Sequence, residues 1–198
     1  MKNILNNTKK GFLMVTMFAT LLSFANETSF YSIAKDAKKT SLTLNNVKEG
    51  NKLSIKDASG VVLYKELIQK TGIYTKGFDL TSLPDGEYVF ELDKDLEINT
   101  IPFTVKANDV NVNKSAETTV FKPFVNQKNN LVFISKLATN LESMHISIYE
   151  ITNNNYELIH SEKVGGTNTI ERVYNLRKGD YKIAITSDNK EYTTFINN

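Results

Sequence analysis

The chain repeats a set of glycine, tyrosine and apolar positions at a constant interval of 93 residues. Members of the two sets keep the class of side chain but often change its identity: Leu53, Ile55, Leu83, Gly86, Tyr88, Phe90 and Leu92 recur as Ile146, Ile148, Leu176, Gly179, Tyr181, Ile183 and Ile185. A constant offset over such a length indicates two copies of one structural unit. Each copy is long enough to bury a core of its own, so we expect two tandem domains.

Both copies alternate apolar and polar residues at period two, which predicts an all-β protein. Seven short strands are expected in the first copy, near residues 30–34, 41–45, 52–57, 61–68, 73–80, 87–93 and 97–106. Seven more are expected near residues 120–125, 131–137, 145–151, 156–163, 169–174, 180–187 and 192–196. Seven is the number expected of a constant-type immunoglobulin-like β-sandwich. We therefore predict sandwiches over residues 26–106 and 118–198, with the polar residues 107–117 as a linker.

Residues 1–25 have the pattern of a secretory signal peptide. Three lysines precede an apolar stretch from Phe12 to Ala25, and small residues stand three and one before Asn26, at Ser23 and Ala25. The alternative is a membrane anchor, but a spanning helix needs about 20 apolar residues and this stretch is shorter. The prediction is an exported protein that has no membrane span once the signal is cleaved.

Charge and cysteine content exclude several classes of function. Removal of residues 1–25 lowers the basic residues from 24 to 21 against 22 acidic ones, so the mature chain is close to neutral. It lacks the positive excess that phosphate neutralisation requires, which makes nucleic acid an unsuitable partner. The chain has no cysteine, so disulfides, thiol nucleophiles and lipid attachment through an N-terminal cysteine are all excluded.

The repeated Leu-x-x-Gly-x-Tyr motif is typical of a tyrosine corner, in which a tyrosine at the start of the sixth strand bonds its hydroxyl back to the chain. The expected corner residues are Leu83, Gly86 and Tyr88 in the first copy and Leu176, Gly179 and Tyr181 in the second. We expect both glycines to adopt the positive φ that glycine tolerates. The role predicted for all six residues is structural.

The segments LSIKDASGVVLYKEL and FDLTSLPDGEYVFEL carry a resemblance to a known family. With Asp57 and Gly60 at a turn and with the corner motif, residues 41–105 resemble the C-terminal sorting domain of proteins exported by the type IX secretion system of Bacteroidota. Residues 131–196 resemble it more weakly, because Glu150 and Asn153 replace the turn residues. The resemblance implies an immunoglobulin-like fold and a setting at the bacterial envelope or outside the cell.

Residues suited to catalysis or metal binding are few, and no cofactor motif is present. The two histidines, His145 and His160, lack a neighbouring motif that would orient and activate them, so we expect surface or rim positions. Alternate carboxylates at Glu91, Asp93, Asp95 and Glu97 could present oxygens to Ca²⁺, but an exposed charged hairpin explains the same pattern. The prediction is a protein without catalytic, cofactor or metal sites.

Three classes of function remain. The leading hypothesis is a secreted or periplasmic binding or structural protein that contacts a protein or glycan at the cell envelope. The alternatives are a secretion-associated protein with a sorting-like domain and a carbohydrate-active enzyme or glycan-binding accessory module. Outward positions that differ between the copies are the best candidates for recognition, and Tyr149 and Tyr156 are such positions. The alternative for these two tyrosines is a cross-strand aromatic pair that only stabilises the sheet.

Overall fold

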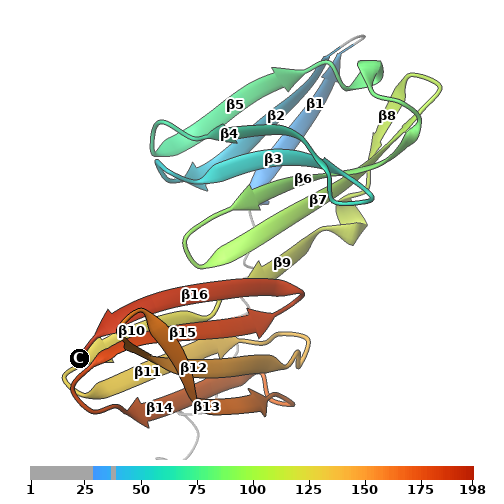
Figure 1. The fold of residues 1–198 in the computed structure, drawn as a ribbon. Coiled ribbons are helices and arrows are strands. Elements are labelled where there is room, and N and C mark those ends of the chain that lie inside the picture. Colours follow the sequence, from blue (N-terminus) through green and yellow to red (C-terminus); the bar gives the residue numbers. More distant parts are fainter. Residues whose placement is uncertain (1–28, 37–38) are drawn as a thin grey trace, which may run out of the picture. The chain divides into compact units, whose positions relative to one another are not determined.

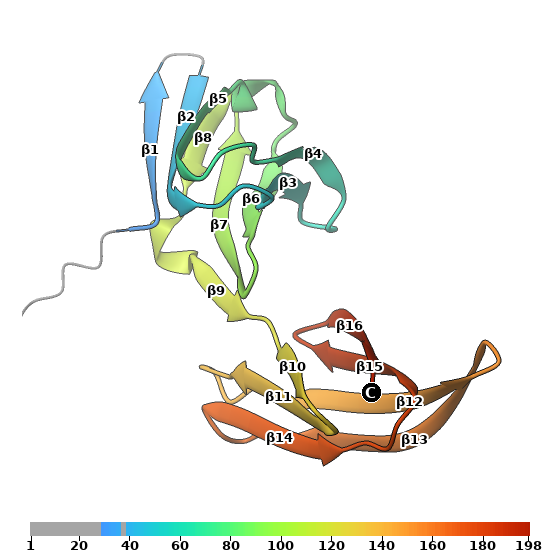
Figure 2. The same ribbon diagram turned by 90° about the vertical axis from the view of Figure 1, so that its left-hand side faces the viewer.

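The computed structural model describes residues 29–36 and 39–198, so the predicted signal peptide at residues 1–25 lies outside the described residues. In this part of the chain, strands and two one-turn 3₁₀ helices make up the regular structure (Figures 1 and 2). The N-terminal set comprises β1 (Tyr31–Asp36), β2 (Lys39–Val47), β3 (Lys52–Asp57), β4 (Val62–Leu67), β5 (Gly72–Phe78), η1 (Leu80–Ser82), β6 (Gly86–Asp93), β7 (Glu97–Lys106), β8 (Asp109–Val112), η2 (Lys114–Ala116) and β9 (Thr118–Phe121). The C-terminal set comprises β10 (Phe124–Lys128), β11 (Leu131–Leu137), β12 (Met144–Thr152), β13 (Asn155–Val164), β14 (Thr169–Asn175), β15 (Asp180–Ser187) and β16 (Lys190–Asn197).

Each set forms two antiparallel sheets with the same strand order. The N-terminal sheets run β1-β2-β5 and β4-β3-β6-β7-β8, and the C-terminal sheets run β10-β11-β14 and β13-β12-β15-β16. Leu53 pairs with Leu92 in the first set, and Ile146 pairs with Ile185 in the second, so the pairing of these central strands is in the same register at the 93-residue offset. The strand order is that of an immunoglobulin-like β-sandwich, and we refer to the two sets as the N-terminal and C-terminal sandwich.

The apolar faces of paired sheets supply the cores. In the C-terminal sandwich, Val132 and Ile134 of β11 pack in one buried cluster with Ile146 and Ile148 of β12 and Ile183 of β15. In the N-terminal sandwich the ring of Phe78 on β5 lies 5.5 Å from that of Phe90 on β6, so aromatic side chains join its two sheets. These inward positions are those that alternation in the sequence marks as apolar.

The fourth strand of each sandwich differs from the constant-type arrangement that the strand number suggested. In that arrangement the fourth strand joins the sheet of the first two strands, whereas here β4 pairs with β3 and β13 with β12. The reason lies in the turns. Asp57 Oδ1 accepts the amide hydrogens of Ser59 and Val61, both at 2.9 Å, and Gly60 has φ +83°, so the chain returns directly beside β3.

The corresponding turn of the C-terminal sandwich has a different chemistry. Asn153 and Asn154 have φ values of 52° and 63°, as a two-residue type I′ hairpin requires. Asparagine tolerates this left-handed conformation better than most residues. The turn keeps β13 in the sheet of β12, so two unrelated turn sequences give the same strand order.

Residues 107–117, predicted as a linker, belong largely to the N-terminal sandwich. Ala107 and Asn108 have φ values of 49° and 63° and turn the chain into β8, which pairs with β7. β9 also pairs with β7, although the sequence placed these residues at the start of the second copy. Val110 of β8 is buried, so the covering strand contributes one apolar contact despite its polar composition.

Candidate functional site

The repeated tyrosines form hydrogen bonds of the same kind. The hydroxyl of Tyr88 donates to the carbonyl of Pro84 at 2.8 Å, and that of Tyr181 donates to the carbonyl of Arg177 at 3.1 Å. Both side chains are buried, and Tyr88 also stacks on Phe103 with ring centroids 5.4 Å apart. Leu83 is half-buried, whereas its counterpart Leu176 is buried in the C-terminal core. These tyrosines act within the fold, because their hydroxyls face the chain and not the solvent.

The expectation that Gly86 and Gly179 have positive φ is wrong. Neither is among the residues with positive φ: Gly86 begins β6 and pairs with Val105 of β7, and Gly179 exchanges two backbone hydrogen bonds with Asn198. A Cβ on Gly86 would lie 3.5 Å from Tyr88, and one on Gly179 would lie 3.4 Å from Tyr181. These are ordinary contact distances, so each glycine lies beneath the tyrosine ring without being required by backbone geometry.

Tyr149 and Tyr156, the predicted recognition residues, share one cation on the outer face of the C-terminal sandwich. Tyr149 is on β12, Tyr156 is on β13, and Lys182 of β15 is the direct strand partner of Tyr149. The Nζ atom of Lys182 lies 5.8 Å from the centroid of each tyrosine ring. Tyr149 is half-buried and Tyr156 is 55% exposed, so the pair presents aromatic area and hydroxyls to solvent.

Further exposed apolar side chains lie in the same row of the sheet. Tyr149 pairs with Leu158 on one side and Lys182 on the other, and Lys182 pairs with Phe195 of β16. Leu158 is 53% exposed and Phe195 is 61% exposed. We call this outer-face group, Tyr149, Tyr156, Leu158, Lys182 and Phe195, the aromatic row. Its chemistry suits stacking and hydrogen bonding.

The equivalent face of the N-terminal sandwich is ionic instead. At the 93-residue offset Lys56 replaces Tyr149, and its Nζ lies 2.7 Å from Glu91 Oε1. Val89 replaces Lys182. A register shift also occurs at the matching place in both hairpins, between Ile55 and Lys56 and between Ile148 and Tyr149. The same backbone framework therefore carries different outer surfaces in the two sandwiches.

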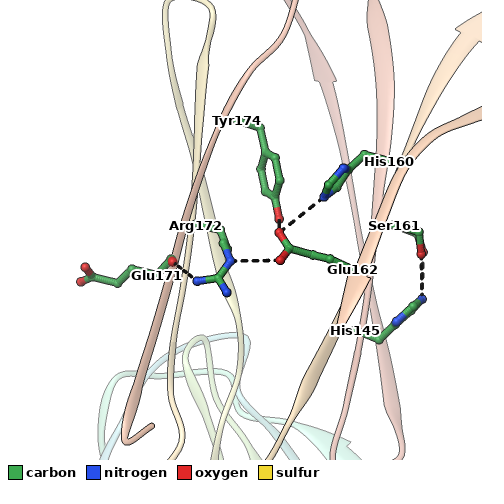
Figure 3. A network of polar contacts seen from close by, with 8 residues as sticks. His145, His160, Ser161, Glu162, Glu171, Arg172 and Tyr174 are labelled. Carbon is green, nitrogen blue, oxygen red and sulfur yellow. Dashed lines mark hydrogen bonds and ion pairs between the residues drawn. The ribbon is translucent and has the colours of Figure 1, made fainter. Parts of the chain in front are cut away.

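Glu162 of β13 is the centre of the polar network drawn in Figure 3. Its carboxylate accepts hydrogen bonds from the Tyr174 hydroxyl at 2.5 Å and from Arg172 Nε at 3.2 Å, and it lies 3.4 Å from His160 Nε2. The bond from Tyr174 holds the pKa of Glu162 below its usual value. Because β13 and β14 belong to different sheets, this network joins the two sheets along one edge of the sandwich.

Glu66 of β4 holds the corresponding position in the N-terminal sandwich. It accepts hydrogen bonds from Tyr64, from Lys76, and from Tyr74 at 3.1 Å, and the bond from Lys76 lowers the pKa of the Glu66 carboxyl. Glu66 pairs with Leu53 and Glu162 with Ile146, so the two carboxylates are equivalent in the repeat. We call each network an edge clamp. Neither clamp is visible in the sequence, because each joins its glutamate to residues on a strand of the other sheet.

The histidines contact hydroxyl and carboxylate groups without forming a catalytic triad. His145 Nε2 lies 3.1 Å from Ser161 Oγ and 3.3 Å from Ser147 Oγ, and Figure 3 shows this pair pointing away from the Glu162 network. His160 belongs to the edge clamp, where it also lies 5.1 Å from the Tyr174 ring. Among the contacts of the described residues, His145 has no carboxylate partner to orient its ring, which a serine nucleophile would require.

The acidic run in the N-terminal sandwich is neutralised by lysines. Glu91 pairs with Lys56 at 2.7 Å, Asp93 with Lys52 at 2.9 Å, Asp95 with Lys48 at 3.3 Å, and Glu97 with Lys94 at 2.6 Å. Residues 29–36 and 39–198 contain no group of three or more histidine or acidic side chains that could hold a metal ion. The run therefore has the contacts of a charged hairpin.

Lys136 of β11 is a buried charge. Its side chain has no exposed area, and its Nζ lies 2.6 Å from Asp188 Oδ2, 2.8 Å from Ser187 Oγ and 3.2 Å from Glu142 Oε1. The sequence does contain one indication of this burial: Lys136 follows Val132 and Ile134 at intervals of two, so strand alternation places it on the inward face. A buried ammonium is tolerated when charges and hydrogen bonds compensate its lost hydration.

Comparisons with known proteins give little beyond the fold. No protein-family model matches the chain, and a search of curated proteins finds no similar one. Among solved structures, the FN1-FN3 domains of chicken CNTN1 are 9% identical, with a TM-score of 0.27, over 84% of this chain and 62% of that one. The BSP domain of a biofilm-associated protein is 12% identical, with a TM-score of 0.25, over 85% of this chain and 29% of that one. The chain thus spans less than two thirds of either structure, and the fold assignment rests on its own strand order.

The described part of the chain contains no helix long and apolar enough to cross a bilayer.

Proposed function

We propose that this chain is an exported, non-catalytic binding module and that the aromatic row is its recognition surface. The observation that carries the proposal is the placement of Lys182 Nζ 5.8 Å from both Tyr149 and Tyr156, on an outer face that is ionic in the other sandwich. Rigid tyrosines with a polar tip are effective contact residues. The setting is the bacterial envelope or the extracellular space, with residues 1–25 as the export signal.

Two features support a role in binding over a role in chemistry. The carboxylates of the acidic run and of the edge clamps are occupied by cations or tyrosines. The His145–Ser161 pair has no orienting acid among the residues that the structure describes. A β-sandwich whose surfaces differ while its framework repeats is suited to presenting recognition groups. The ligand classes that fit are a protein surface or a glycan, because both contact exposed tyrosines through apolar area and hydroxyls.

The proposal is tested by finding a ligand and then altering the aromatic row. The immobilised protein is screened against a glycan array and against envelope proteins, and a retained ligand is titrated by calorimetry. Tyr149→Ala and Tyr156→Ala should each weaken binding by about 1 to 2 kcal/mol without changing the thermal unfolding midpoint. Lys56→Ala, at the position equivalent to Tyr149, is the matched control and should leave the affinity unchanged.

Loss of binding in Lys56→Ala together with full binding in the Tyr149 and Tyr156 double variant would place recognition on the other sandwich and reject the proposed surface. A glycan-hydrolysis assay on the same array tests whether the chain has catalytic activity. Release of reducing sugar that depends on a carboxylate of the chain would replace the binding role with an enzymatic one.

A further inference from the structure

The two sandwiches differ in what covers the outer edge of the last strand of the larger sheet. In the N-terminal sandwich that strand is β7, and its outer edge is fully occupied. β8 pairs with residues 103–106 of β7, and β9 pairs with residues 97–100. The N-terminal sandwich therefore uses two additional segments of the chain to satisfy the backbone groups of this edge.

The counterpart in the C-terminal sandwich, β16, has an uncovered edge. It pairs with β15 in an unbroken register from Lys190 to Asn197, and among the described residues it pairs with no other strand. A two-residue turn with positive φ at Asp188 and Asn189 closes this hairpin, which makes Ser187 and Lys190 a hydrogen-bonded pair. It follows by alternation that the backbone groups of residues 191, 193, 195 and 197 point away from β15.

β16 also lacks the devices that usually protect an edge strand. Native edges are shortened, bulged, interrupted by proline or charged along their length. β16 has eight residues, no register shift and no proline, and its charged residues, Lys190 and Glu191, lie at the hairpin end. The opposite edge of the same sheet is protected, since β13 contains a register shift and holds the edge clamp at Glu162.

The sequence of β16 is complementary to itself in an antiparallel pair centred on Thr194. In that register Tyr192 faces Ile196 of the other copy, and both side chains already pack against the C-terminal core. Thr194, on the same inward face, faces its own counterpart, and on the outer face Phe195 faces Thr193. Lys190 and Glu191 then lie opposite the uncharged Asn198 and Asn197, so no like charges oppose each other across the strands.

We infer that β16 pairs antiparallel with β16 of a second copy, which joins two β13-β12-β15-β16 sheets into one eight-stranded sheet across a two-fold axis. The pairing satisfies the outward backbone groups of both edges, as β8 and β9 do for β7. It is an isologous contact and closes at the dimer. The inference does not depend on the aromatic row having a ligand.

Sedimentation of the purified chain over a range of concentrations tests the inference. We expect a concentration-dependent dimer and its loss in Thr193→Pro, because the N–H of Thr193 faces the partner and not β15. The thermal unfolding midpoint of Thr193→Pro, extrapolated to low concentration, should equal that of the parent. Val173→Lys, which adds charge at a 56% exposed side chain of β14, is the control and should still dimerise.

Cysteine cross-linking gives a second readout that does not depend on how Thr193→Pro folds. The chain has no cysteine of its own, and facing residues in a non-hydrogen-bonded antiparallel pair have Cα atoms about 4.5 Å apart, within disulfide range. Thr194→Cys should form an intermolecular disulfide under mild oxidation, and Glu191→Cys should form much less. A chain that stays monomeric at every concentration, or a dimer in which Thr194→Cys does not cross-link faster than Glu191→Cys, would overturn the inference. If β16 instead binds a strand of another protein, the purified chain alone would stay monomeric at every concentration.

Discussion

The N-terminal and C-terminal sandwiches share their inward-facing positions and differ in almost everything that faces outward. Strand order, central register and the tyrosine hydrogen bond are the same at a 93-residue offset. The outer face, by contrast, carries a Lys56–Glu91 ion pair in one sandwich and the aromatic row in the other. Packing constrains an inward side chain on every side, whereas an outward one is free to diverge. The differences between the copies are therefore where a specific role is to be sought.

Removal of a corner tyrosine should have the largest effect. Tyr88→Ala and Tyr181→Ala each lose a buried aromatic and a hydrogen bond, and each should destabilise its own sandwich by about 3 to 5 kcal/mol. Tyr88→Phe and Tyr181→Phe remove only the hydrogen bond and should cost about 1 kcal/mol. Hydrogen exchange resolved by peptide measures where protection is lost. Equal loss of protection in both sandwiches from Tyr88→Ala would show that they do not unfold independently.

Lys136 provides a contrast that is specific to the C-terminal sandwich. Lys136→Ala removes the cation that Asp188 and Glu142 share, and it leaves a cavity next to Ser187. Both carboxylates keep partial access to water, so we expect a loss of about 2 kcal/mol, below that of a fully buried unpaired charge. Lys136→Met fills the cavity and should recover part of the stability. Chemical denaturation measures the free energy of unfolding of both variants. If Lys136→Ala has the same free energy of unfolding as the parent, the buried ion pairs contribute no net stability.

The edge clamps should make both sandwiches sensitive to acid. The pKa values of Glu66 and Glu162 are lowered in the folded state, so each carboxylate contributes stability above its unfolded pKa, near 4.3, and this contribution is lost as the pH falls through the lower folded pKa. Glu66→Gln and Glu162→Gln should lower the thermal midpoint at pH 7, and the deficit should shrink below about pH 4.

Exposed Glu87→Gln on β6 is the control for the loss of one negative charge. It should show neither the deficit at pH 7 nor its disappearance in acid. A deficit in the clamp variants that stays constant from pH 7 to pH 3 would indicate that the glutamates act through packing and not through charge.

The sequence predicted the inward framework because alternation and the repeat both report on it. The pairing of Leu53 with Leu92 and of Ile146 with Ile185 involves residues that period two marks as inward. It did not predict the sheet of the fourth strand, which depends on turn geometry. It also missed β8, because a covering strand with one buried residue, Val110, leaves almost no hydrophobic pattern.

The candidate site was predicted in part. Tyr149 and Tyr156 were chosen as outward differences between the copies, and the structure brings them together around Lys182. That lysine was not foreseen, since its strand neighbours only emerge once β12 and β15 are paired. The edge clamps were missed for the same reason, because Glu162 meets Tyr174 only across two sheets. Side-chain networks between sheets depend on tertiary packing that a local pattern does not contain.

The smallest expected effect concerns the glycines beneath the corner tyrosines. Gly86 has extended backbone and a Cβ there would meet the Tyr88 ring at 3.5 Å, an ordinary contact distance. Gly86→Ala should therefore leave stability unchanged or raise it by up to about 1 kcal/mol, because alanine reduces the freedom of the unfolded chain. Gly179→Ala, with a slightly closer contact at 3.4 Å, should behave in the same way.

Gly60→Ala is the matched comparison, because Gly60 has free space around it but a positive φ, whereas Gly86 has a close neighbour and no positive φ. A Cβ on Gly60 would meet nothing within 4 Å, but its φ of +83° is unfavourable for alanine. The substitution should cost about 1 kcal/mol through backbone strain alone. The thermal unfolding midpoints of the three variants thus distinguish the cost of steric contact from the cost of an unfavourable backbone conformation. A loss in Gly86→Ala equal to that in Gly60→Ala would show that the corner does impose a backbone requirement, and it would restore glycine conformation as the reason for the repeated Leu-x-x-Gly-x-Tyr motif.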